Sequence, residues 1–149
     1  MNNKNKTHKV GVYVSHRGRL LLIREKSEGH RDYRWNIVKG SVDAKDGSFI
    51  NAAKRECREE TGLIVKPAGV LNISYRRRKL KPVTQVNILA TSASGQPKLN
   101  SPSKQRALNE DIVAAKFFTP AALLKLPRRE LMNDRVWRGI RRWIKVKGR

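Results

Sequence analysis

Three glutamates lie close together in the middle of the sequence. Glu56, Glu59 and Glu60 would share an arc of roughly 100° on a helix. Like charges at these spacings repel by a few tenths of a kcal/mol per pair, and the whole chain has only 12 acidic residues. A hard divalent cation such as Mg²⁺ would compensate this charge, because it prefers oxygen ligands. The alternative is a solvated helix face that Arg55 and Arg58 neutralise in part.

The segment around these glutamates has the pattern of a capped helix. Asp46-Gly47-Ser48 supplies capping residues for a helix from about Phe49 to Thr61, and Gly62 stands where a left-handed C-terminal cap is expected. An apolar stripe borders the carboxylates; it consists of Ile50, Ala53 and Cys57. We therefore expect the glutamates to lie at the edge of the core. Cys57 is the only cysteine, and we expect it to be a small buried residue.

Composition sets the wider limits. A chain of 149 residues with 38% hydrophobic and 31% charged residues is typical of one globular domain, here residues 1–149 with 1–7 flexible. We find no apolar stretch long enough to span a membrane and no secretory signal, so we expect a cytoplasmic protein. The formal charge of +22 favours polyanionic partners, either phosphate-rich small molecules or nucleic acid.

Two parts of the chain concentrate the positive charge. The run from Arg76 to Lys81, which includes Arg78, joins two predicted strands and could reach a substrate phosphate. Its alternative is a solvated hairpin tip that adds solubility. The C-terminal helix, capped by Asn133 or Asp134, alternates cations with apolar residues at spacings of three and four. We expect its tryptophans to be core anchors.

Alternating and apolar runs predict a mixed sheet covered by helices. Lys9–Ser15 has the alternation of a half-buried strand. Further strands are predicted at Leu20–Ile23, Trp35–Val38, Leu63–Tyr75, Pro82–Thr91 and Val113–Phe118. A short helix is predicted at Pro120–Lys125, and the segment Ser92–Ala107 is predicted to be a long loop.

The order of residues around the glutamates closely resembles the Nudix box. That motif reads Gly, five residues, Glu, seven residues, then Arg-Glu-apolar-any-Glu-Glu-any-Gly-apolar, and Arg55 to Leu63 match its second half at every fixed position. The first half departs from the pattern. Counted from Gly40, the loop is one residue too long and Asp46 replaces the glutamate. In the family this acidic residue pairs with the motif arginine, so the departure bears on how rigidly Arg55 is held.

The resemblance covers about Lys9 to Ile144. It implies an α/β fold of the Nudix type, an α/β/α sandwich with a mixed sheet between helices. It also implies a pyrophosphohydrolase that uses Mg²⁺, or alternatively Mn²⁺, for attack of water at phosphorus. The implied metal set is Gly40, Glu56, Glu59 and Glu60, with Arg55 orienting the glutamates.

The sequence does not identify a single substrate. We expect contacts to it from Lys39, Arg76, Arg78 and Glu110, and either Glu110 or a helix glutamate would be the general base. Cationic groups favour nucleoside triphosphates, dinucleoside polyphosphates, diphosphoinositol polyphosphates or the 5′ end of RNA. We interpret Tyr75 and Pro82 as structural residues. Two alternatives are a nucleic-acid-binding protein on a Nudix scaffold and a scaffold that has lost catalysis.

Overall fold

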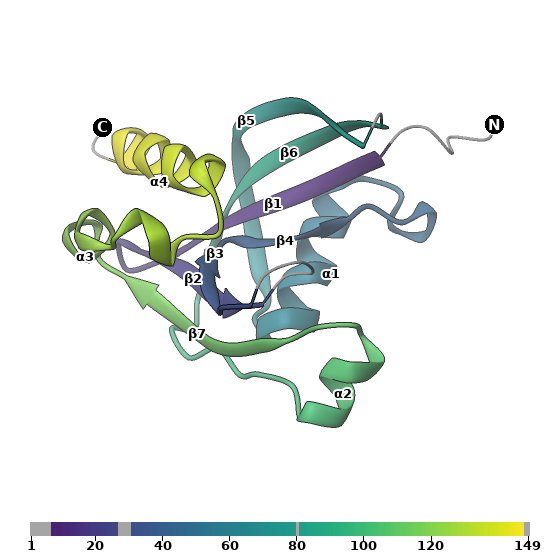
Figure 1. Ribbon diagram of the computed structural model, residues 1–149, viewed down its shortest axis with the longest axis horizontal. Coiled ribbons are helices and arrows are strands. Elements are labelled where there is room, and N and C mark those ends of the chain that lie inside the picture. Colours follow the sequence, from purple (N-terminus) through teal and green to yellow (C-terminus); the bar gives the residue numbers. More distant parts are fainter. Residues whose placement is uncertain (1–6, 27–30, 80, 148–149) are drawn as a thin grey trace.

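The computed structural model describes residues 7–26, 31–79 and 81–147, apart from the side chain of Arg78 (Figure 1). Within these residues the strands are β1 (Thr7–His16), β2 (Arg19–Glu25), β3 (Arg34–Asn36), β4 (Val38–Ser41), β5 (Val65–Arg78), β6 (Lys81–Ser92) and β7 (Ile112–Phe118). The helices are α1 (Phe49–Thr61), α2 (Pro102–Ala107), α3 (Pro120–Lys125) and α4 (Asp134–Lys147), with short 3₁₀ helices η1 (Ala44–Asp46) and η2 (Arg128–Glu130).

Strand β1 is the centre of one mixed sheet. It runs parallel to β6 along most of its length, and β5 pairs antiparallel with the far edge of β6. On its other edge β1 pairs first with β4, from Lys9 to Val12, and then with β2 at Ser15 and His16. Strands β3 and β7 pair with β2. Because β4 occupies the space where β1 and β2 diverge, its residues lie near the middle of the fold.

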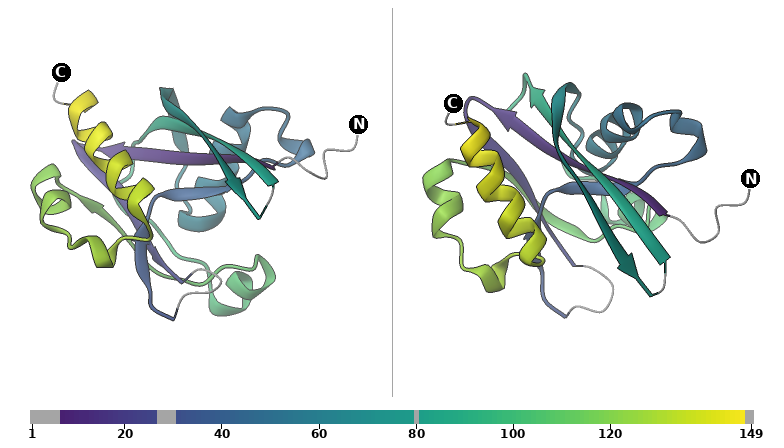
Figure 2. Two further views of the ribbon diagram at one scale, coloured as in Figure 1. Left: turned by 45° about the horizontal axis from the view of Figure 1, so that its top comes forward. Right: turned by 90° about the horizontal axis from the view of Figure 1, so that it is seen from above.

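Helices cover both faces of the sheet (Figure 2). The face toward α1 buries one apolar cluster, in which Val12, Leu21 and Ile88 of the sheet pack with Ala53 and Cys57 of the helix. The opposite face buries a second cluster with α3 and α4; its largest members include Leu22, Leu123, Ile140 and Trp143. The predicted mixed sheet between helices is therefore confirmed, as is the burial of Cys57.

The prediction that the first strand is half-buried is wrong. All residues from Val10 to Val14 are buried, because both faces of the strand are covered. Val10, Val12 and Val14 pack in the apolar cluster on the side of α1, and Tyr13 packs in the cluster on the side of α4. Thr7 begins this strand, so it is not part of a flexible N-terminus; residues 1–6 lie outside the described residues.

Three other boundaries differ from the prediction. The strand predicted at Trp35–Val38 is two short strands separated by Ile37, whose N–H is taken by the side chain of Asn36. The predicted loop from Ser92 to Ala107 contains α2, which has no buried residue and hence no apolar stripe to indicate it. The basic run belongs largely to the strands, since β5 extends to Arg78 and β6 starts at Lys81.

Helix α4 lies unusually close to β1. Gly139 faces the ring of Tyr13, and a Cβ atom at this glycine would lie 1.8 Å from the Tyr13 hydroxyl oxygen. Asn133 caps the helix by accepting from the N–H of Val136 at 3.1 Å. Trp143 is buried as predicted, whereas Trp137 is only partly buried against the same cluster. Among the described residues, no helix has the length and apolarity needed to cross a bilayer.

We expect Gly139→Ala to lower the free energy of unfolding by about 1–3 kcal/mol, because the new methyl group overlaps the Tyr13 hydroxyl. On an uncrowded helix the same change would raise the free energy of unfolding by about 1 kcal/mol. The sign of the change therefore shows whether the helix is crowded at this position. Urea denaturation measures it. The double variant Gly139→Ala/Tyr13→Phe should recover part of the loss. A stabilised single variant would contradict the close approach.

Candidate active site

Helix α1 presents its carboxylates toward the end of β4. The Ser48 side chain accepts from the N–H of Asn51 at 3.1 Å, and Gly62 adopts the left-handed conformation with φ 70°, so both predicted caps are confirmed. Glu56 and Glu60 are 9% and 6% exposed, while Glu59 is half-buried. The local sequence thus sets the length and orientation of the helix, and the sheet buries two of its three glutamates.

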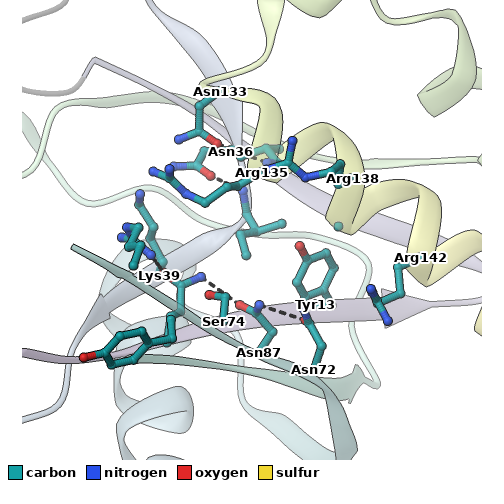
Figure 3. A pocket seen from close by; sticks show the side chains of 16 residues that line it. Tyr13, Asn36, Lys39, Asn72, Ser74, Asn87, Asn133, Arg135, Arg138 and Arg142 are labelled. Atoms are coloured by element: carbon teal, nitrogen blue, oxygen red, sulfur yellow. Dashed lines mark hydrogen bonds between the residues drawn. The ribbon is translucent and has the colours of Figure 1, made fainter. Parts of the chain in front are cut away.

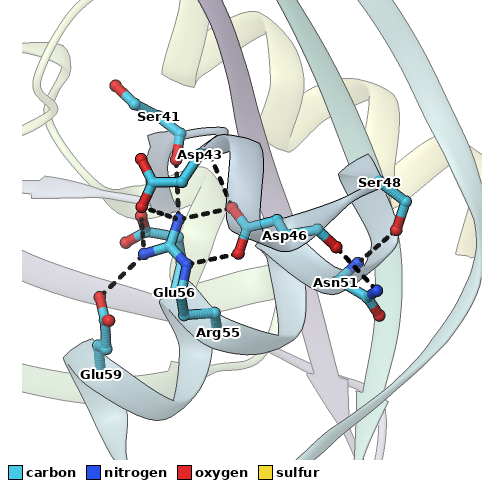
Figure 4. Close-up of polar contacts among 8 residues, drawn as sticks. All are labelled: Ser41, Asp43, Asp46, Ser48, Asn51, Arg55, Glu56 and Glu59. Carbon is cyan, nitrogen blue, oxygen red and sulfur yellow. Dashed lines mark hydrogen bonds and ion pairs between the residues drawn. The ribbon is translucent and has the colours of Figure 1, made fainter.

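Arg55 joins the middle of α1 to the preceding loop (Figure 4). Its Nε donates to Asp46 Oδ1 at 2.8 Å and its Nη2 to Asp46 Oδ2 at 3.0 Å. Nη2 also donates to the backbone oxygen of Ser41 at 2.9 Å. Nη1 donates to Glu56 Oε1 at 3.0 Å and to Glu59 Oε2 at 3.2 Å. Every nitrogen of the guanidinium therefore has an oxygen partner.

The contact with Asp46 supports the alignment counted from Gly40. The shorter aspartate reaches Arg55 because η1 and the left-handed Gly47, φ 74°, bring it back toward the helix. The bidentate ion pair lowers the pKa of the Asp46 carboxyl, chiefly through the hydrogen bonds from Arg55. The irregular first half of the motif thus still holds its arginine firmly.

Burial leaves the helix carboxylates short of compensating charge. Burial raises the pKa of Glu56 to about 7, against the opposing effect of Arg55. Burial and the neighbouring charge of Glu56 hold the pKa of Glu60 well above its ordinary value. The Oε2 atom of Glu60 is buried and has no hydrogen-bond partner among the described residues. Two buried acids that favour protonation are the arrangement expected where a cation is to be bound.

These residues suit a divalent cation that is also held by substrate and water. Arg55 binds one oxygen each of Glu56 and Glu59, which leaves their second oxygens for other ligands. A Cβ atom at Gly40 would lie 2.1 Å from Glu56 Cδ, so only a glycine lets the β4 backbone approach this carboxylate. The described residues contain no ready-made group of three or more His, Cys, Asp or Glu side chains that could hold a metal alone. Mg²⁺ commonly takes its remaining ligands from water and phosphate.

Glu110 lies with the helix carboxylates and does not line the pocket that opens between β5, β6 and α4. Its Oε1 accepts from Asn100 Nδ2 at 3.3 Å, and the same Asn100 nitrogen donates to the backbone oxygen of Glu59. Burial raises the pKa of Glu110, and the charge of Glu59 adds to the effect. The structure therefore places Glu110 beside the helix glutamates and not in the pocket where a substrate contact was expected for it.

Sequence reasoning missed Glu25. This half-buried residue ends the apolar strand β2, and its Oε2 accepts from Asn36 Nδ2 at 3.3 Å. Burial raises its pKa, while the charge of Lys39 opposes the shift. Its charge in turn raises the pKa of Glu60. The available signal was the alternation along the strand, because Glu25 follows Leu21 and Ile23 at spacings of two and so faces the same side of the sheet as these buried residues.

A pocket of about 380 Å³ opens between β5, β6 and α4 (Figure 3). Its charged lining residues are all cations: Lys39, Arg76, Arg135, Arg138 and Arg142. Burial lowers the pKa of Lys39 to about 8. Lys39 and Arg76, two of the predicted substrate contacts, therefore line one pocket, whereas the side chain of Arg78 lies outside the described residues.

The floor of this pocket is a row of amides. Gln85 Nε2 donates to Asn87 Oδ1 at 2.8 Å, and Asn87 Nδ2 donates to Asn72 Oδ1 at 2.9 Å. Gly11 makes room for the row, since a Cβ there would lie 2.2 Å from Asn87 Oδ1. Tyr75 also lines the pocket and is 70% exposed, which speaks against the structural role expected for it.

Strand β4 connects the pocket to the carboxylates. Lys39 lines the pocket, while the next residue, Gly40, packs against Glu56. A ligand with phosphates at one end can therefore place that end between cations and carboxylates while its other end contacts the amides. The positively charged pocket and the negatively charged carboxylates thus meet at Lys39 and Gly40.

Comparison with known proteins agrees with this geometry. A family model described as NUDIX domain matches residues 6–138. A 17.7 kDa protein of Enterobacteria phage T4 is 49% identical over 37 residues, which are 25% of this chain and 24% of that protein. The chain therefore spans about a quarter of the length of this curated relative.

Two solved structures show the same fold. A NUDIX hydrolase from Nitrosomonas europaea has a TM-score of 0.74 at 18% identity, covering 95% of this chain and 90% of that one. The NUDIX domain of Shewanella oneidensis NrtR, complexed with ADP ribose, has a TM-score of 0.68 at 14% identity, covering 98% and 90%. The predicted α/β/α sandwich is confirmed by these likenesses.

We expect Asp46→Asn to lower activity or metal affinity by about 10- to 100-fold, because it removes the charged partner that orients Arg55. Steady-state kinetics and Mg²⁺ titration measure the effect. The matched control is Asp43→Asn, since Asp43 lies 3.6 Å from Arg55 and its side chain is 54% exposed. Equal effects of the two substitutions would contradict the special role of Asp46.

Metal-free protein is expected to lose stability as the pH rises from about 5 to 7. Folding raises the pKa of Glu56 from 4.5 to about 7 and that of Glu60 in the same direction. Unfolding therefore releases protons in this window, and the free energy of unfolding falls with rising pH, by on the order of 2 kcal/mol.

Thermal unfolding in EDTA at pH 5, 6 and 7 measures this slope. Excess Mg²⁺ at pH 7 should restore the melting temperature, and Glu60→Gln should flatten the slope because it removes one of the buried acids. If the melting temperature in EDTA stayed constant from pH 5 to 7, burial would not raise the pKa values of these two acids, and the prediction would be wrong.

Proposed function

Because the chain belongs to the NUDIX domain family, we propose that it is a Mg²⁺-dependent hydrolase that cleaves a phosphoanhydride bond in a nucleotide-like substrate. The observation that carries the proposal is the junction at Lys39 and Gly40. There, a cation-lined pocket adjoins a group of carboxylates whose charge Arg55 compensates only in part. A polyphosphate needs the first surface, and the divalent cation bound to it needs the second.

The pocket supports a substrate with a nucleoside at one end. Its amide row offers both donors and acceptors, which suits a base or a sugar, and Tyr75 offers an exposed ring at the rim. The cations account for the phosphates. A volume of about 380 Å³ fits a mononucleotide-sized group. The Shewanella oneidensis domain was solved with ADP ribose, a ligand with this division between nucleoside and diphosphate.

Glu56, Glu59 and Glu60, with the backbone oxygen of Gly40, would hold the metal. When bound, the cation would neutralise phosphate charge and polarise the attacking water. Arg55 keeps two of the carboxylates in place, and Lys39 holds a phosphate from the pocket side. Water bonds to phosphorus, its proton passes to a carboxylate, and the bridging oxygen leaves with the bonding electron pair.

Glu110 is a suitable acceptor for that proton. Burial raises its pKa, and Asn100 ties its side chain to the end of α1 beside Glu59. It makes no hydrogen bond to Arg55 among the described residues, so it can turn toward a water more freely than Glu56 or Glu59. This separates the residues that bind metal from the residue that takes the proton.

The test is product release with Mg²⁺ across nucleoside triphosphates, dinucleoside polyphosphates, ADP ribose, diphosphoinositol polyphosphates and triphosphorylated RNA. We expect turnover of one class, reduced at least about a hundredfold by Glu60→Gln. Glu110→Gln should lower kcat by about the same factor while Mg²⁺ affinity is kept. The matched control is Glu130→Gln, an exposed glutamate of η2 that lies outside the site.

Two outcomes would contradict the proposal. Absence of turnover across the panel, in protein shown to be folded, would indicate a Nudix scaffold that has lost catalysis. Turnover that survives Glu60→Gln undiminished would show that the chemistry occurs elsewhere.

A further inference from the structure

A second hollow lies along the outer side of α4. It has a volume of about 420 Å³ and is lined by Arg128, Trp137, Arg138, Arg141, Arg142 and Lys145. Five of these six residues are cations and none is acidic. We refer to this hollow as the cationic groove.

The cations of the groove lack neutralising partners. Arg138, Arg141, Arg142 and Lys145 are exposed and follow one another at spacings that place them on neighbouring turns of the helix. Like charges at such spacings destabilise a helix. Among the described residues, no carboxylate lies within ion-pair distance of any of them, because the ion pairs found there all involve Arg55. An anion bound in the groove would remove this repulsion.

Trp137 holds two of the cations in place. The guanidinium of Arg128 lies 5.0 Å from the centre of its ring and that of Arg141 lies 5.5 Å from it. The ring is thus engaged by arginines, which leaves little of it for stacking on a base. Guanidinium groups that are held in advance suit phosphate oxygens, with which they form paired hydrogen bonds. The groove is therefore built to recognise phosphate and not base identity.

The groove adjoins the pocket between β5, β6 and α4. Arg138 and Arg142 line both hollows, so the cations of the two hollows lie next to one another along α4. A mononucleotide-sized ligand fills only the pocket. An anion that contacts the cations of both hollows would be longer than a mononucleotide and would carry several phosphates.

We propose that the cationic groove binds the phosphodiester backbone of a nucleic acid strand. The excess of 34 basic over 12 acidic residues strengthens the attraction of such a strand at long range. Binding is independent of base sequence and releases counterions, so its affinity falls steeply with salt. This inference does not rest on the proposed hydrolysis, because backbone phosphodiesters need not be cleaved.

The test is fluorescence anisotropy with a labelled single-stranded RNA of 20 nucleotides that ends in a 5′ hydroxyl, in EDTA. The variant Arg128→Gln/Arg141→Gln/Lys145→Gln changes residues that line the groove but not the pocket. We expect it to weaken binding by about tenfold or more at low salt. The slope of log affinity against log salt should become shallower by about 2, since each phosphate contact contributes about 0.7.

The matched control removes three positive charges from exposed residues of α1, β5 and α2, as Arg58→Gln/Lys66→Gln/Arg106→Gln. It should keep the wild-type salt slope and lose no more than about threefold in affinity. An equal loss in both variants would show attraction by net charge alone and overturn the proposal. So would the lack of RNA binding by the wild type at low salt.

Two further measurements identify the anion and distinguish this proposal from the proposed hydrolase activity. DNA of the same sequence should bind about as well as the RNA, because both present the same charged phosphodiester groups. Vesicles with phosphatidylserine should not compete. Direct binding of the protein to these vesicles, together with no binding to RNA, would reassign the groove to a membrane surface and overturn the proposal. Turnover of the small-molecule substrate by the groove variant should equal that of the wild type, so each proposal can fail alone.

Discussion

The contacts of Arg55 determine how the rest of the site is arranged. One guanidinium joins the loop, through Asp46 and the Ser41 backbone, to two glutamates of α1. It supplies part of the positive charge that lets these acids lie at the edge of an apolar core. Because the arginine reaches back across the loop, it also sets the distance between α1 and the end of β4. The loop can thus accept an extra residue as long as a carboxylate returns to the same place.

Charge is separated across the sheet in a way that suits a polyphosphate. Acids gather on the side of α1, where Glu25 and Glu110 add to the glutamates of the helix. Cations gather on the side of α4, in the pocket and in the cationic groove. The two regions meet at Lys39 and Gly40, which belong to the strand that fills the space between β1 and β2. The proposed polyphosphate substrate, with a divalent cation bound, would neutralise cations on one side and acids on the other.

The close packing of α4 on β1 determines where the cations lie. Gly139 allows the helix to approach the ring of Tyr13, while Ile140 and Trp143 anchor its inner face. The arginines between these apolar positions then face either the pocket or the outer surface. One amphipathic helix therefore serves both as a cover for the core and as a source of positive charge along its exposed side.

The sequence by itself determined the features that depend on neighbouring residues. The length of α1, its Ser48 and Gly62 caps and the clustering of its glutamates follow from spacing and capping chemistry, which act within a few residues. Tertiary structure decided the rest, since the decisive contacts join distant segments. Only the folded sheet shows that Glu25 enters the acidic group and that Tyr75 faces a pocket. The pairing of β4 in the space beside β1, which sequence periodicity does not encode, brings cations and carboxylates together.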